Sequence, residues 1–422
     1  MSHSLARLRR GAAVAVAAGA LTVPLTGAPA GAAQAGAPVA AATGSPILSS
    51  PSPSPSGPDA VRPLTPQVTR RLDSAVRQVM RTADVPGVTV GVWTPDRGSY
   101  VRSFGVADRS DGRRMAPDMY VRIGSETKTF TVTALLQLVD QGKAGLDDPI
   151  GRYVDGVPNG DRITLRELAG MRSGLFNYSE DDGFFKALTS DPQRPFTPRQ
   201  LLGYSFRHPV MFPPGRKFYY SNTNLILLGL VVERQSGLKL GDYIRRHILV
   251  PAGMKDTSFP SGAGFPSPHP QGYTDQTADG KVQDTADWNP SWAWAAGAMI
   301  STVGDLRTWA PTVATGRFPD GRRMISAAAQ RQRLDTPPTA IPGAGYGLGI
   351  FDVQGWIGHN GSLPGYETLT IHLPEARTTL VVALNTDIGH DNQEPSTLFG
   401  RAVTRIISPG HVFDLPAQPA AR

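Results

Sequence analysis

The chain has 422 residues, 40% of them hydrophobic and 18% charged, with a formal net charge of +7. That length allows one large or two moderate domains with a real core, and basic runs no longer than pairs such as Arg245-Arg246 exclude nucleic acid as the expected partner. The absence of cysteine excludes disulfides, lipid-modified cysteine and thiolate–metal sites.

Residues 1–33 have the layout of a secretory signal peptide. Basic residues precede an apolar run from Gly11 to Leu25, and Ala28-Pro-Ala30 supplies small residues for cleavage, which we expect near Ala30 to Ala33. The alternative, a transmembrane anchor, needs about 20 apolar residues, and Pro24 ends this run early. We therefore predict a secreted protein with no transmembrane anchor after signal removal.

The remaining chain divides by composition. Residues 34–64 are rich in Ala, Gly, Ser and Pro and predict a disordered linker. Residues 65–409 are predicted to form one domain large enough for an enzyme. Within it, residues from about 147 to 324 are predicted to form a mostly helical subdomain. Residues 410–422 are predicted to form a tail.

The predicted elements give the fold class. Apolar residues at helical spacing follow Pro66, and strand-like runs cover Gly87–Trp93 and Tyr100–Val106. A helical run follows Ser125, and Gly142 is expected to cap it. Further strand-like runs are Gly345–Phe351, Glu367–Leu373 and Thr378–Leu384. The order predicts an α+β fold, in which an antiparallel sheet draws strands from both chain ends around a helical insertion.

Ser125 and Lys128 form a Ser-x-x-Lys pair at the start of that helical run. A serine nucleophile needs a neighbour that accepts its proton, and residues three apart on a helix lie on one face. The free N–H groups and positive dipole end of a helix N-terminus favour both a lowered lysine pKa and a developing oxyanion. The pair therefore predicts a nucleophile with its own base.

The pair alone is weak, because 28 serines and 7 lysines give roughly 0.5 matches by chance. A second copy, Ser236-Gly-Leu-Lys239, follows an apolar helical run, and Gly237 is typical of a left-handed helix cap. The helix dipole has the wrong sign there for a lowered lysine pKa, so we expect no site at that copy.

Two later motifs complete the pattern. In Tyr220-Ser-Asn222 the tyrosine could relay a proton and the asparagine could hold a substrate amide, although an exposed turn is the alternative. In His359-Asn-Gly361-Ser362 a strand edge could donate a backbone N–H to an oxyanion, with an ordinary turn histidine as the alternative. The three motifs in this order are expected about 0.01 times by chance.

Together the motifs resemble those of the serine hydrolases of the class C β-lactamase and D-alanyl-D-alanine carboxypeptidase (penicillin-binding protein) superfamily. The resemblance covers roughly Thr65 to Ile407 and includes Tyr346-Gly-Leu-Gly349. It implies a β-lactamase/transpeptidase-like fold with the active site in a cleft between the sheet and a mostly helical domain.

The resemblance also implies roles for the site residues. Ser125 would be acylated, Lys128 would accept its proton, and Tyr220 would act with Lys128 as general base and acid. Asn222 would hold the acyl side chain, and the N–H groups of Ser125 and Ser362 would form the oxyanion hole. His359, Asn360 and Gly361 would border the bound substrate on the strand.

Three positions need comment. Met171 stands where many relatives have histidine, Phe351 lies near the place of a carboxylate-binding arginine in carboxypeptidases, and Asn360 replaces a common threonine. Because arginine is hard to replace at a carboxylate, specificity for a free carboxylate is open. Trp292 resembles an aromatic wall of the cleft, with a core tryptophan as the equal alternative.

The leading functional hypothesis is a secreted D,D-peptidase, D-alanyl-D-alanine carboxypeptidase-like, acting on peptidoglycan peptides. Alternatives with the same chemistry are an esterase, a β-lactamase, or a D-amino-acid amidase or aminopeptidase; a non-catalytic penicillin-binding or wall-binding module is the alternative of another class. We expect no cofactor and no metal, and a small peptide, ester or β-lactam as the substrate. The mild surplus of basic residues could contact cell-wall peptidoglycan; the alternative is that it only forms a solvated face. We expect the protein to be a monomer.

Overall fold

The structure of the protein is a computed structural model that describes residues 64–95 and 97–415. The predicted signal peptide, the predicted linker apart from Leu64, and residues 416–422 of the predicted tail lie outside the described residues.

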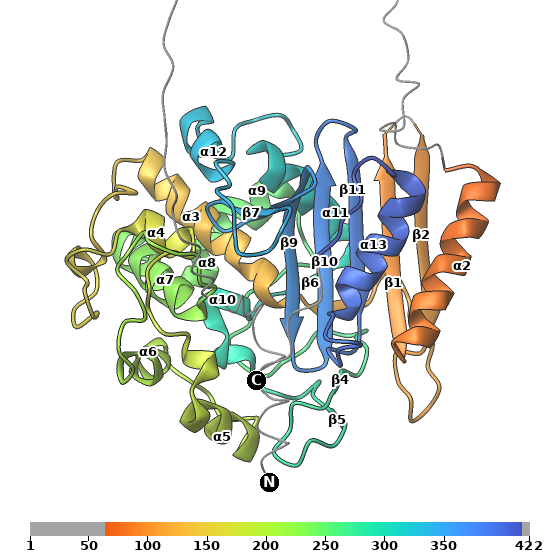
Figure 1. Ribbon diagram of the computed structural model, residues 1–422, viewed down its shortest axis with the longest axis horizontal. Helices are drawn as coiled ribbons and strands as arrows, with labels where there is room; N and C mark the ends of the chain where they lie inside the picture. Colours follow the sequence, from red (N-terminus) through yellow and green to blue (C-terminus); the bar gives the residue numbers. More distant parts are fainter. Residues whose placement is uncertain (1–63, 96, 416–422) are drawn as a thin grey trace, which may run out of the picture.

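A seven-stranded antiparallel sheet forms the centre of the fold (Figure 1), in the order β2-β1-β11-β10-β9-β8-β7. The strands are β1 (Gly87–Thr94), β2 (Gly98–Gly105), β7 (Ala344–Tyr346), β8 (Phe351–Val353), β9 (Trp356–Leu363), β10 (Tyr366–Leu373) and β11 (Thr378–Leu384). Every residue of β10 and β11 is buried, because helices cover both faces of the sheet. The sheet therefore joins strands from both ends of the chain, as the sequence predicts.

Helices α2 (Pro66–Thr82) and α13 (Pro395–Ile407) pack together on one face of the sheet, while α11 (Val303–Thr315) packs on the other (Figure 1). The α2 helix begins where the Thr65 hydroxyl accepts a hydrogen bond from the Val68 N–H at 3.3 Å. Its buried side chains Val68, Leu72 and Val76 recur every four residues, which turns one stripe of the helix to the core.

The inserted helical region lies beside the sheet, with α3 (Thr127–Asp140) between the two (Figure 1). Its further helices are α4 (Leu165–Ala169), α5 (Asp182–Ser190), α6 (Pro198–Phe206), α7 (Asn222–Ser236), α8 (Leu240–Ile244), α9 (Val250–Ala252), α10 (Trp294–Gly297) and α12 (Ala327–Arg333), with shorter helical turns at η1 (Gly124–Glu126), η2 (Ile150–Arg152), η3 (Tyr178–Glu180), η4 (Arg245–Leu249) and η5 (Pro290–Trp292). Two small pairs, β3 (Tyr120–Arg122) with β6 (Ile300–Thr302) and β4 (Tyr273–Thr274) with β5 (Gln283–Asp284), complete the region. Almost every residue of α3 is buried, which makes α3 the central helix.

One predicted strand is wrong. The run Gly345–Phe351 is not continuous, because β7 ends at Tyr346 and β8 begins at Phe351. Gly349 between them has a φ of +71°, a left-handed conformation that ends an extended strand. The predicted cap at Gly142 is confirmed by its φ of +69° just beyond the end of α3.

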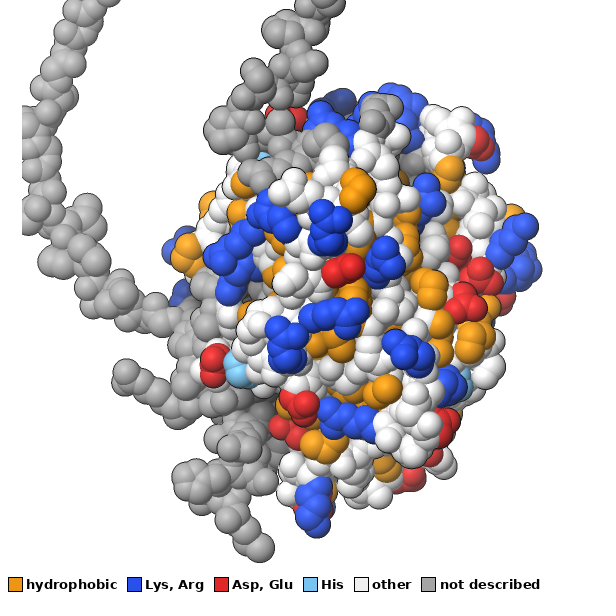
Figure 2. All heavy atoms as spheres, turned by 90° about the vertical axis from the view of Figure 1, so that its right-hand side faces the viewer, with side chains coloured by type: hydrophobic (Ala, Val, Ile, Leu, Met, Phe, Trp, Pro, Cys, Tyr) orange, Lys and Arg blue, Asp and Glu red, His pale blue; other side chains and the backbone are white. Residues whose placement is uncertain are grey.

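Arginine side chains gather on the face formed by α2 and β2 (Figure 2). The exposed arginines of these elements are Arg70, Arg71, Arg77, Arg81 and Arg102. Asp73 is the one acidic residue of α2, and it contacts Arg102 at 3.7 Å. This face therefore carries net positive charge. None of the described helices is long and apolar enough to cross a bilayer.

Candidate active site

Ser125 and Lys128 meet at the junction between the sheet and the helical region. Ser125 lies in the helical turn η1, directly before α3, and Lys128 lies in the first turn of α3. The Lys128 Nζ donates a hydrogen bond to the Ser125 Oγ at 2.8 Å. The predicted pairing of the two side chains on one helical face thus holds, although the serine precedes the α-helix itself.

Lys128 is fully buried, and its amine also donates to the backbone oxygen of Ala296 at 2.8 Å. Within the described chain, no carboxylate forms an ion pair with it. Burial therefore holds the pKa of the Lys128 ammonium well below its usual value. A neutral amine in contact with a hydroxyl can accept the proton of that hydroxyl.

Tyr220 brings a third polar group to the same point. It lies two residues before Asn222, the first residue of α7, and is 1% exposed. The Lys128 Nζ lies 4.9 Å from the centre of its ring. Burial raises the pKa of the Tyr220 phenol, against a hydrogen bond with Ser125 that lowers it. The phenol is therefore protonated at neutral pH and can give its proton to a leaving group.

The strand β9 lies against the turn that carries Ser125. A Cβ added to Gly124 would lie 2.6 Å from the Ser362 nitrogen, and one added to Gly361 would lie 2.8 Å from the Ile123 carbonyl carbon. Ordinary contacts between such atoms are about 3.5 to 4.0 Å, so both positions require glycine. This close approach holds the Ser362 backbone N–H beside the residue that precedes Ser125.

His359 faces the same group from β9. Its Nε2 lies 3.3 Å from the Tyr346 hydroxyl, and its ring centre lies 6.1 Å from that of Tyr220. Burial and the nearby Lys128 lower the pKa of His359 to about 3, so the ring is neutral at physiological pH. No group of three or more His, Asp or Glu side chains in residues 64–95 and 97–415 has a metal-binding arrangement.

The Asn360 side chain does not join this group. Successive residues of a strand point to opposite faces, and the Asn360 amide donates to Glu394 at 2.6 Å, at the start of α13. The predicted contact of this side chain with substrate is therefore not supported, because the amide is turned to the α13 face of the sheet.

Asn222 lies at the start of α7, where its side-chain amide donates to Ser179 at 3.1 Å. Its backbone N–H donates to the Asn177 side chain at 3.1 Å. The segment 176–181 is thus joined to the start of α7, two residues after Tyr220.

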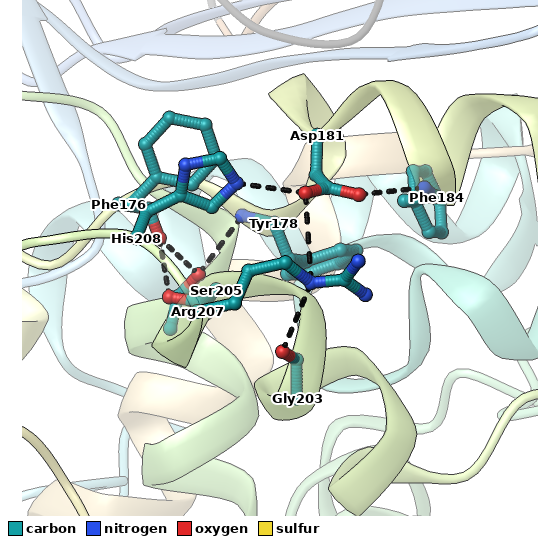
Figure 3. A network of polar contacts seen from close by, with 9 residues as sticks. Phe176, Tyr178, Asp181, Phe184, Gly203, Ser205, Arg207 and His208 are labelled. Atoms are coloured by element: carbon teal, nitrogen blue, oxygen red, sulfur yellow. Dashed lines mark hydrogen bonds and ion pairs between the residues drawn. The ribbon is translucent and has the colours of Figure 1, made fainter.

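Asp181 anchors that segment (Figure 3). It accepts hydrogen bonds from His208 Nε2 at 2.7 Å and from the Phe184 N–H at 2.8 Å, and Arg207 lies 3.7 Å away. Burial opposes ionisation, but the hydrogen bonds and Arg207 hold the pKa of the Asp181 carboxyl below its usual value. The His208 ring also stacks on Phe176 with centres 3.8 Å apart, so both ends of the segment 176–181 have defined contacts.

Three further positions have defined surroundings. Trp292 is 4% exposed and its ring lies 5.9 Å from that of Phe184, which favours the core alternative over a cleft wall. The Met171 sulfur accepts from the Ser221 N–H at 3.5 Å and so supports the Tyr220 turn. Phe351 is buried against His359 and Tyr346, with ring centres 4.9 and 4.7 Å apart.

The second Ser-x-x-Lys copy lacks these surroundings. The Ser236 hydroxyl donates to its own helix at Val232, and the Lys239 side chain is 84% exposed. Gly237 has the predicted left-handed conformation at the end of α7. The two copies differ in burial, which the motif does not encode.

Two buried residues near Ser125 are not singled out by the three motifs. Tyr346 lies in the segment Tyr346–Gly349, outside the three motifs, and its hydroxyl contacts His359. Glu126 lies between the serine and the lysine in sequence and is 1% exposed. Burial raises the pKa of its carboxyl to about 8. A charged residue between two motif positions was the available signal.

The comparisons with known proteins agree on one family. A family model described as Beta-lactamase matches residues 72–402. Penicillin-binding protein 4* of Bacillus subtilis is 26% identical over 345 residues, which cover 76% of this chain and 72% of that protein. The D-aminopeptidase of Brucella anthropi is 29% identical over 330 residues, which cover 75% of this chain and 59% of that protein, so the match spans less than two thirds of this relative.

Among solved structures, a D-stereospecific amidohydrolase from Streptomyces sp. is similar over 79% of this chain and 98% of its own, with 29% identity and a TM-score of 0.69. The predicted β-lactamase/transpeptidase-like fold and the predicted family resemblance are confirmed by these likenesses.

Proposed function

Because the chain belongs to the beta-lactamase family of serine hydrolases, we propose that it cleaves amide bonds at the carboxyl side of D-amino acid residues through an acyl-enzyme on Ser125. The reaction needs a nucleophile, a base, an oxyanion site and an acid for the leaving amine. The geometry supports one group for each role.

Acylation begins when the neutral Lys128 amine accepts the proton of Ser125, 2.8 Å away, as the Ser125 oxygen attacks the substrate carbonyl. The N–H groups of Ser125 and Ser362 then stabilise the oxyanion. As the carbon–nitrogen bond breaks, the protonated Tyr220 phenol gives its proton to the departing amine and recovers one from the Lys128 ammonium. The buried, neutral His359 adds no positive charge to this exchange.

Deacylation uses the same groups in reverse roles. Lys128 and Tyr220 take a proton from an incoming water, whose oxygen attacks the ester carbonyl, and Ser125 leaves with that proton. The products are a carboxylic acid and an amine, and the enzyme returns to its starting protonation state.

Phe351 is the observation that favours an uncharged group beyond the scissile bond. Carboxypeptidases of this superfamily are expected to place arginine near this position, whereas Phe351 is 4% exposed and packs on His359. An apolar ring cannot form the paired hydrogen bonds that a carboxylate requires. The similarity to a D-stereospecific amidohydrolase is a second observation that supports an amide substrate.

A D-alanyl-D-alanine carboxypeptidase is the second candidate, favoured by the similarity to penicillin-binding protein 4*. In that case the carboxylate would have to be bound without arginine at Phe351. The two candidates share the acyl-enzyme and differ in the charge of the substrate.

A turnover panel separates the candidates. We would compare a D-Ala-D-Ala peptide with a free carboxylate, its C-terminal amide, D-phenylalanine amide, a short-chain ester and a cephalosporin, with Ser125→Ala as the blank. We expect kcat/KM for the amides to exceed that for the free carboxylate by at least tenfold. A preference for the free carboxylate would reject the amidase assignment and favour the carboxypeptidase.

Export, wall contact and the monomeric state remain proposals. The sequence of residues 1–33 supports cleavage and secretion, and the arginine face of α2 and β2 (Figure 2) suits an anionic wall surface. N-terminal sequencing of protein recovered from the medium tests cleavage, and light scattering tests the monomer. An uncleaved N-terminus or a higher mass would reject the respective proposal.

A further inference from the structure

The Asn360 amide, on the α13 face of the sheet, contacts one of two neighbouring carboxyl groups behind the active-site strand. Asn360 is 4% exposed and its Nδ2 donates to the Glu394 Oε2 at 2.6 Å. Glu394 precedes α13, and the first turn of α13 also contacts Glu367, whose Oε2 accepts from the Ser396 N–H at 2.8 Å. Glu367 lies opposite Ser362 in the β9–β10 register. The pair therefore lies directly behind the residues of β9 that border Ser125.

Burial raises the pKa of both carboxyl groups. Burial and the charge of Glu394 raise the pKa of Glu367 well above its usual value. Burial also raises the pKa of Glu394, but the Asn360 amide lowers it by donating to the ionised form. The resulting pKa of Glu394 is about 7, and its carboxyl group offers the Asn360 amide an acceptor oxygen in the ionised and the protonated form alike. Glu394 as a whole is half-buried, and its contact with the Asn360 amide is partly buried.

Asn360 connects the Glu394 side chain to His359. The His359 Nδ1 lies 2.5 Å from the Asn360 backbone oxygen, which can only accept a hydrogen bond. The proton of the neutral ring must therefore be on Nδ1, which leaves Nε2 as the acceptor facing the Tyr346 hydroxyl at 3.3 Å. The orientation of one peptide group thus sets both the tautomer and the direction of the histidine ring.

We propose that Glu394 is a positioning residue for the reaction: through the Asn360 amide it fixes the backbone of β9, and thereby the His359 ring and the Ser362 N–H, against Ser125. The catalytic part of this statement rests on the proposed function, while the structural part does not. Neither Glu394 nor Asn360 touches the reacting atoms. Asn360, which stands where relatives commonly have threonine, thus holds the backbone of β9 in place.

Four single variants, and the double variant of Asn360→Ala with Glu394→Ala, test the proposal. Glu394→Ala and Asn360→Ala each remove the contact, whereas Glu394→Gln keeps an acceptor oxygen for Asn360 without the charge. The control is Asp391→Asn, since Asp391 lies in the same segment, is 88% exposed, and has a φ of +48° that asparagine tolerates.

The first readout is kinetic. We expect kcat, or the rate of acylation by a fluorescent penicillin, to fall at least tenfold in Glu394→Ala and in Asn360→Ala, with KM changed less than threefold. The double variant should lose no more than the worse single variant. Glu394→Gln should stay within threefold of wild type, as should the control. Wild-type kcat in Glu394→Ala, or a loss of melting temperature alone, would overturn the proposal.

The second readout does not depend on activity. Nitrogen NMR of histidine-labelled protein, with the His359 signal identified by its loss in His359→Gln, reports the ring tautomer. We expect a single Nδ1–H tautomer in wild type and in Glu394→Gln, and a mixture in Glu394→Ala. An unchanged tautomer in Glu394→Ala would overturn the proposal. If wild type shows no turnover and no acylation, the proposed function fails, and the tautomer still decides the role of Glu394.

Discussion

Gly361→Ala tests whether the close approach of β9 to the Ser125 turn controls catalysis. The added Cβ would lie 2.8 Å from the Ile123 carbonyl carbon, whereas carbon atoms in contact lie about 3.5 to 4.0 Å apart. Because Ile123 presents backbone here, no side-chain rotation relieves the clash. The strand must therefore move by roughly 1 Å, and a displacement of that size in an active site costs on the order of 10²-fold in rate.

The assay is the rate of covalent labelling by a fluorescent penicillin, with thermal unfolding measured in parallel. We expect labelling to slow by about 10²-fold, with a loss of stability of about 1 to 3 kcal/mol from overpacking. Gly203→Ala is the matched control, because a Cβ there meets no atom within 4 Å and Gly203 lies inside α6. Labelling of Gly361→Ala within threefold of wild type would refute the argument that this contact positions the oxyanion site.

Three further predictions concern buried ionisable groups. Lys128→Met should slow acylation by about 10²- to 10⁴-fold, the usual contribution of a general base, and a near-normal rate would remove Lys128 from that role. Burial raises the pKa of Glu126 from 4.5 to about 8, so its protonated form stabilises the fold at low pH and this stabilisation is lost as pH rises from about 4.5 to 8. By pH 7 this loss should amount to on the order of 3 kcal/mol of unfolding free energy, and Glu126→Gln should remove it. Chemical denaturation at several pH values measures the unfolding free energy. The same pH dependence in wild type and in Glu126→Gln would contradict this prediction. The pKa of His359 is lowered from 6.5 to about 3. The contribution of the neutral ring to the stability of the fold is therefore fully present above pH 6.5 and is lost as the pH falls toward 3. His359→Gln should thus leave the pH profile of kcat/KM between pH 5 and 8 unshifted, and a displaced acid limb would contradict a neutral ring.

Much of the fold could be predicted from the sequence because its strands and helices carry periodic apolar residues. The stripe Val68, Leu72 and Val76 predicts α2, and it is buried as expected. The break at Gly349 could not be predicted in the same way, since the left-handed turn there replaces an apolar run that reads as one strand. Tertiary contact, not local pattern, decides between a continuous and a broken strand at that position.

The candidate site shows the same division. Motif order singles out Ser125 and Lys128 over Ser236 and Lys239, and the structure adds the burial that separates them, since Lys128 is fully buried. The motif does not predict the face of the sheet to which the Asn360 side chain turns. Successive side chains of a strand point to opposite faces, so a residue next to His359 can turn away from the site. Glu394 lies 34 residues beyond Asn360 in sequence, in a segment without a motif, and only the packing of α13 brings the two together.

The most direct test of the account is the mass of the intact protein after exposure to a penicillin. We expect wild type to gain the mass of one penicillin molecule, with the adduct mapped to the peptide that contains Ser125, and Lys239→Met to behave like wild type. Ser125→Ala should gain nothing. An adduct that persists in Ser125→Ala would contradict the assignment of Ser125 as the nucleophile and with it the proposed reaction.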